Sequence, residues 1–166
     1  MNGNTFEKTT ASVAAWNLST FDPLSDERIE KQAKGLALLD AELITLVEIK
    51  NLDHLVKLKA HLEESGVRYD FHMLEQNSPG DGRNPMNIGV LYKRGVEVTE
   101  AFLMEGSDLG NPNYRRAYVC NVKIHKFDFK LIGVHLKSSR DSNSQKIRDE
   151  QCKAVSYTHL TLPTKA

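Results

Sequence analysis

The chain has 166 residues, of which 40% are apolar and 27% charged, so its size and composition suit one globular domain with its own core. Its 22 basic and 22 acidic residues balance, which excludes the strongly basic footprint of many nucleic-acid binders but leaves room for a local patch. No apolar run approaches the roughly 20 residues of a membrane span, no signal peptide is visible, and the two cysteines make no disulfide framework.

The first half of the chain alternates strand and helix patterns. Strands are predicted at 11–18, 43–49 and 67–75, and amphipathic helices at 26–40 and 53–65. Ser25 or Asp26 is expected to cap the first helix, and Asn51 or Asp53 the second. Residues 1–10 are expected to be flexible, and a loop rich in glycine and proline is expected at 77–85.

The second half is mainly antiparallel in pattern. Strands are predicted at 87–92 and 96–104, a loop at 105–113, and a hairpin of 115–126 with 129–137 that turns at Phe127-Asp128. Residues 141–155 are compatible with a helix. The fold class is therefore α/β (α+β) with a mixed sheet. We interpret 155–166 as a non-native run-out tail on a domain spanning 11–154, with a genuine short strand as the alternative.

Three apolar strands end in polar side chains. Val13-Ala-Ala-Trp-Asn17 ends in an amide, Leu43-Ile-Thr-Leu-Val-Glu48 in a carboxylate, and Phe129-Lys-Leu-Ile-Gly-Val-His135 in an imidazole. Ligands of α/β sheets gather outside the carboxyl ends of the strands. We therefore expect these three side chains to form parts of one site.

Each candidate also has a structural interpretation. In the structural interpretation, Asn17 caps the turn after its strand, Glu48 is a solvated strand end, and His135 is a hydrogen-bonded strand histidine. An arginine at the start of a hairpin strand, such as Arg115, is usually at the surface. Four further histidines show no metal-ligand spacing with Cys or acidic residues and are interpreted as structural: His54, His61, His72 and His125.

Five short motifs in order resemble a known family. They are Trp16-Asn17, Glu48 after an apolar strand, Asn87-Ile-Gly-Val-Leu-Tyr92, Arg115-Arg-Ala-Tyr-Val and Val134-His-Leu-Lys-Ser138. Together they resemble the endonuclease/exonuclease/phosphatase superfamily, which has the deoxyribonuclease I-like fold. The resemblance implies a four-layer α/β/β/α sandwich and hydrolysis of phosphodiesters or phosphomonoesters with a divalent metal, Mg²⁺ or Mn²⁺.

The resemblance also implies roles for particular residues. Glu48 matches the metal-ligand glutamate of the family, Asn17 the asparagine beside that metal, and His135 the first catalytic histidine. Arg115 is the better match to a substrate-side arginine, with Arg116 as the second choice, and Lys137 would add a charge near the substrate. The implied partner is a phosphate ester, nucleic acid among the options.

The sequence departs from the family pattern after residue 138. The Gly-Asp-x-Asn motif, the later aspartate and the terminal Asp-His pair are not found there. We therefore expect an incomplete sandwich, the amino-terminal portion of such an enzyme, which is inactive and only marginally soluble as it stands. The alternative is a non-catalytic domain that binds a partner through the same fold. A doubly wound nucleotide-binding domain is poorly supported, because no Gly-x-Gly-x-x-Gly or P-loop follows the first strand.

Overall fold

Four strands form the first sheet, in the order β1-β2-β4-β3, in the computed structural model, which describes residues 10–19, 24–76 and 86–161. β1 (Val13–Asn17) is parallel to β2 (Leu43–Ile49), and β4 (Asn87–Tyr92) is antiparallel to both β2 and β3 (Asp70–Leu74). β1, β2 and β3 therefore point the same way. The carboxyl ends of these three strands therefore lie at the same end of the sheet as the first residue of β4.

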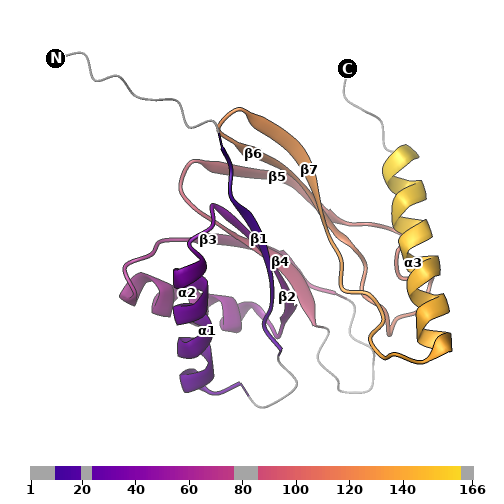
Figure 1. Ribbon diagram of the computed structural model, residues 1–166, viewed down its shortest axis with the longest axis horizontal. Helices are drawn as coiled ribbons and strands as arrows, with labels where there is room; N and C mark the ends of the chain where they lie inside the picture. Colours follow the sequence, from indigo (N-terminus) through magenta and orange to yellow (C-terminus); the bar gives the residue numbers. More distant parts are fainter. Residues whose placement is uncertain (1–9, 20–23, 77–85, 162–166) are drawn as a thin grey trace.

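Two helices cover one face of this sheet, α1 (Asp26–Leu39) and α2 (Leu52–Glu64) (Figure 1). Each begins at an expected cap, because Ser25 Oγ accepts a hydrogen bond from the Arg28 N–H and Asn51 Oδ1 accepts one from the His54 N–H. Apolar residues of both helices share a core with residues of β2 and β4: Ile29, Ala33, Leu36, Leu55, Leu58, Leu62, Ile44, Leu46, Ile49 and Leu91.

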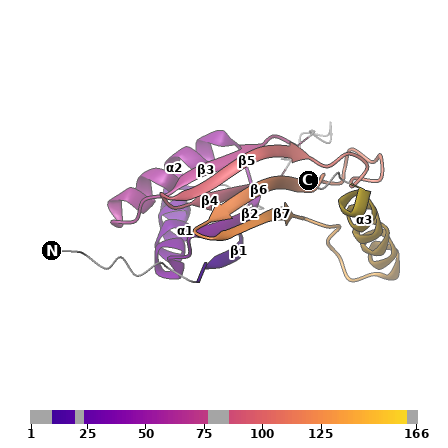
Figure 2. The ribbon, with the colours of Figure 1, turned by 90° about the horizontal axis from the view of Figure 1, so that it is seen from above.

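The second sheet consists of β5 (Val96–Leu103), β6 (Tyr118–Ile124) and β7 (Phe127–Gly133), paired antiparallel in that order. It lies against the face of the first sheet that the helices leave open (Figure 2). The sheets approach closely at Gly133, where a Cβ atom would lie 3.0 Å from Ile88 Cγ2 and 3.2 Å from Thr45 Cγ2. A larger residue there would force the two sheets apart.

A carboxylate and an imidazole join the two sheets at the amino end of β2. Glu42 is buried, and its Oε1 lies 2.6 Å from Nε2 of His125, in the turn between β6 and β7. The other carboxylate oxygen accepts a hydrogen bond from the Ser12 N–H at 3.0 Å. This contact anchors the far sheet to the start of β2.

The third helix, α3 (Ser142–Thr161), stands apart from α1 and α2, beside the far end of the second sheet (Figure 1). Its Val155 contacts a small cluster formed by Met104, Ala117 and Val119. The predicted mixed α/β class with two packed sheets is confirmed. In the described part of the chain, α3 alone represents the outer helical layer on that side.

Several boundaries differ from the prediction. The hairpin turns at His125-Lys126 rather than at Phe127-Asp128, because His125 adopts a left-handed φ of 55° that closes the turn two residues earlier. Residues 155–161 continue α3, so the short-strand alternative is wrong for them, while the run-out interpretation stays a prediction. The predicted loop at 77–85 and residues 1–9 of the predicted flexible terminus lie outside the described residues.

Candidate functional site

Glu48 occupies a β-bulge in β2. Leu46 pairs with Gly89 and Ile49 with Asn87, so two residues of β2 lie opposite one residue of β4. Glu48 has a φ of 61°, in the left-handed region. Without the bulge, Glu48 would follow Ile44 and Leu46 onto the face that the helices cover. With the bulge, Ile49 packs into that core and the Glu48 carboxylate points toward Asn17 and His135 instead. Bulges beside active sites often redirect a side chain in this way.

Asn17 at the end of β1 is the first neighbour of this carboxylate. Its Nδ2 donates a hydrogen bond of 2.9 Å to Glu48 Oε1, and its Oδ1 accepts one of 2.7 Å from the Ser19 N–H. Asn17 therefore caps the turn after its strand and orients Glu48 at the same time. Glu48 is only 3% exposed, so the solvated strand end considered from the sequence is wrong.

His135 approaches the same oxygen from the second sheet. β7 ends at Gly133, four residues before the predicted end of that strand, so His135 lies beyond it. The His135 Nε2 lies 3.4 Å from Glu48 Oε1. Burial and the positive charge of Arg115 lower the pKa of His135, and the charge of Glu48 opposes them. The imidazole is therefore neutral at neutral pH. Its Nδ1 is buried without a hydrogen-bond partner among the described residues, which is unusual for a polar atom.

The structure separates the two candidate arginines. The Arg116 Nε donates a 2.8 Å hydrogen bond to Asp108 Oδ2, with which it forms an ion pair. Arg115 is the one whose charge acts on His135. Lys137 follows His135 by two residues, and its backbone is fixed to α3 through the side chains of Gln151 and Arg148.

A buried chain of hydrogen bonds, formed by the side chains of His54 and Gln32, was not predicted. The His54 Nδ1 accepts from the Lys50 N–H at 3.4 Å, and its Nε2 lies 3.0 Å from Gln32 Oε1. The Gln32 Nε2 donates to the Leu18 carbonyl at 2.7 Å. These hydrogen bonds thus connect α2 through α1 to Leu18, the residue after Asn17. No local sequence signal marks these contacts, since they join residues from different elements.

Comparison with solved structures identifies the fold. A truncated TDP2 from Caenorhabditis elegans matches with a TM-score of 0.65 and 18% identity over 92% of this chain and 57% of its own. TDP2 from D. rerio, complexed with a single-strand DNA product, matches with a TM-score of 0.68 and 18% identity over 94% and 57%. An endonuclease/exonuclease/phosphatase family protein from Bacteroides thetaiotaomicron matches with a TM-score of 0.63 and 16% identity over 90% and 58%.

The chain has the fold of the endonuclease/exonuclease/phosphatase superfamily, and the resemblance seen in the sequence is confirmed at that level. It spans a little over half the length of these three structures. No protein-family model and no curated protein matches the chain. Among the described residues, no helix is long and apolar enough to cross a membrane.

Proposed function

We propose that the chain is the amino-terminal part of a divalent-metal-dependent phosphoesterase. One observation carries the proposal: Glu48 Oε1 lies 2.9 Å from Asn17 Nδ2 and 3.4 Å from His135 Nε2, at the edge of the sheet where ligands of α/β proteins collect. The two sheets supply these three groups, so their meeting does not follow from a single local motif. The shared fold with phosphatase and nuclease family proteins supports the same reaction class.

The residues present fit part of a magnesium site. Mg²⁺ is commonly held in proteins by one or two carboxylates while it keeps several waters. Glu48 would supply a carboxylate, with Asn17 setting its orientation. Among the described residues no cluster of three His, Cys, Asp or Glu side chains could hold an ion, so Glu48 fits a shell made mostly of water and substrate oxygens. Bound Mg²⁺ or Mn²⁺ would neutralise charge on the phosphoryl oxygens.

The other candidates would act on the phosphate itself. A neutral imidazole donates a hydrogen bond without carrying charge, so His135 suits a phosphoryl or leaving-group oxygen. Arg115 offers the planar guanidinium fork that matches phosphate, and Lys137 would add a point charge. The D. rerio protein of similar fold holds a single-strand DNA product, which makes nucleic acid a reasonable substrate class to test here.

We expect the 166-residue chain to bind the ion without hydrolysing phosphate esters. The later acidic and histidine motifs that the resemblance implies are not found after residue 138, and the chain covers only part of the proteins of similar fold. Measurable Mg²⁺-dependent hydrolysis of a generic phosphodiester, lost in Glu48→Ala, would overturn this expectation of inactivity while supporting the site.

The test of the proposal is therefore metal binding. Mn²⁺ added to ¹⁵N-labelled protein should broaden the amide resonances around Glu48, and Glu48→Gln should abolish the broadening. Glu42→Gln is the matched control, because Glu42 is also a buried carboxylate beside a histidine but lies at the opposite end of β2. Broadening that survives Glu48→Gln, or that centres on Glu42, would refute the proposed function.

A further inference from the structure

The segment that leads into β6 is fastened to the loop before it. The Met104 N–H donates a 2.8 Å hydrogen bond to the Ala117 carbonyl. The Ser107 hydroxyl accepts from the Ala117 N–H at 2.9 Å and donates to the Met104 carbonyl at 2.6 Å. These bonds fix the backbone one residue beyond Arg116.

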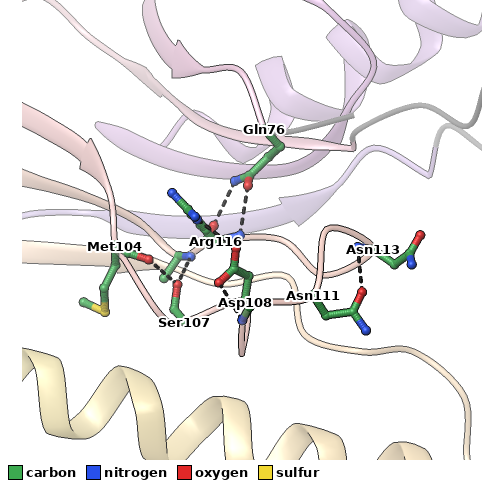
Figure 3. Close-up of polar contacts among 9 residues, drawn as sticks. Gln76, Met104, Ser107, Asp108, Asn111, Asn113 and Arg116 are labelled. Carbon is green, nitrogen blue, oxygen red and sulfur yellow. Dashed lines mark hydrogen bonds and ion pairs between the residues drawn. The ribbon is translucent and has the colours of Figure 1, made fainter. Parts of the chain in front are cut away.

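Gln76 fastens Arg116 from the other side. Its side-chain Oε1 accepts from the Arg116 N–H at 2.9 Å, and its Nε2 donates to the Arg116 carbonyl at 2.8 Å (Figure 3). The amide thus satisfies both backbone groups of one residue, as a neighbouring strand would. Gln76 itself is buried, with 6% of its surface exposed. Its backbone N–H donates a 2.8 Å hydrogen bond to Asn87 Oδ1, which fixes its position.

Asp108 fixes the side chain of the same residue. It accepts the Arg116 Nε–H at 2.8 Å through Oδ2, while its Oδ1 accepts the Gly110 N–H at 3.2 Å (Figure 3). The side chain of Asp108 is only 7% exposed. Arg116 is therefore held by backbone and guanidinium together, and turning it away would remove the cation that faces a buried carboxylate.

Holding Arg116 in this way constrains Arg115. Arg115 is joined to Arg116 by a peptide bond, so its backbone cannot shift without breaking the hydrogen bonds that Gln76 makes to Arg116. The Arg115 Nη1 donates to the Asn113 carbonyl at 3.2 Å. Asn87, which binds the Gln76 N–H, also donates through its Nδ2 to the carbonyl of Lys50, the residue after β2, at 3.4 Å.

We propose that Gln76 and Asp108 are positioning residues that aim Arg115 at a phosphate held beside Glu48 and His135. The ligand in this statement rests on the proposed function. The positioning itself rests only on the hydrogen bonds to Arg116.

The experiment measures the order of the Arg115 side chain in the full 166-residue chain. The guanidinium Nε–Hε resonance is assigned by its loss in Arg115→Lys, and its order parameter is obtained by ¹⁵N relaxation. We expect a value above about 0.6 in the wild type and below it, in the range of mobile groups, in Gln76→Ala. Asp108→Asn, which keeps the side-chain size, should lower the Arg115 order parameter by a smaller amount. This second variant tests the proposal even if Gln76→Ala fails to fold.

Asn121→Ala is the control, since it removes side-chain hydrogen bonds to Glu100 and Lys130 within the second sheet but none to Asn113, Arg115 or Arg116. It should leave Arg115 unchanged. An Arg115 that is mobile in the wild type, or equally ordered in Gln76→Ala and Asp108→Asn, would overturn the positioning.

Inorganic phosphate and a 5′-phosphorylated dinucleotide, each added with Mg²⁺, separate the two proposals. Titration of the Arg115 resonance gives an apparent affinity for each ligand. An affinity at least fivefold weaker in Gln76→Ala than in the wild type supports both the phosphate contact and the positioning. An ordered Arg115 that does not respond to either ligand would overturn its proposed phosphate contact and leave the positioning intact.

Discussion

The left-handed backbone at Glu48 predicts an inverted order of stability for two substitutions at that position. Glu48→Ala and Glu48→Gly remove the same carboxylate and its contacts to Asn17 and His135, so their difference reports mainly on the backbone. A left-handed L-residue costs roughly 1–2 kcal/mol relative to glycine, and glycine loses about 0.4–1 kcal/mol more chain entropy on folding. We expect Glu48→Gly to be the more stable variant by about 0.5–1 kcal/mol.

Val47 provides the control, because it lies next to Glu48 in β2 and has no positive φ. There the order should reverse, with Val47→Gly less stable than Val47→Ala by roughly 0.5–1 kcal/mol. Urea unfolding followed by the fluorescence of Trp16, the single tryptophan of the chain, measures all four variants. If glycine is the less stable residue at both positions, Glu48 is not strained in solution and the bulge does not explain its placement.

Three further predictions concern stability. Burial and the charge of Lys50 lower the pKa of His54 to about 4, so the folded state binds fewer protons than the unfolded state below pH 6.5. Stability should therefore fall between pH 6.5 and 4 by up to about 3 kcal/mol, and urea unfolding of His54→Gln should show a flatter profile. Gly35→Ala should cost up to about 2 kcal/mol despite the better helix former, because its Cβ would lie 2.8 Å from Trp16 Cη2; a stabilised variant would refute the close approach. Asn51→Ala should cost about 1 kcal/mol by removing the cap of α2, and an unchanged thermal midpoint would contradict that role.

The parts of the fold set by hydrophobic pattern were predictable. β2 and β4 were predicted at their observed bounds, 43–49 and 87–92, because each is an apolar run ended by polar or turn residues. The grouping of Asn17, Glu48 and His135 was also predicted, although His135 comes from the second sheet rather than from a third strand of the same sheet. Their catalytic and metal-binding roles, and those of Arg115 and Lys137, stay predictions.

The contacts that refine the site could not be read from the sequence. A bulge adds one residue to a strand, and the apolar run around Glu48 is equally consistent with a regular strand. Gln76 binds Arg116 across 40 positions, and such a pairing leaves no periodic trace. The close approach of Gly35 to the ring of Trp16 likewise joins two elements and leaves no local signal in the sequence.

β2 meets the second sheet through a carboxylate and an imidazole at each of its ends, Glu42 with His125 and Glu48 with His135. Movement of one sheet along the other would separate the Glu42–His125 pair and the Glu48–His135 pair together, so the two contacts oppose such a movement. The distance between the strand that bears Asn17 and the one that precedes His135 is therefore fixed by the rigid body of the sandwich. A change of shape in this domain is therefore expected in its loops rather than in the packing of the two sheets.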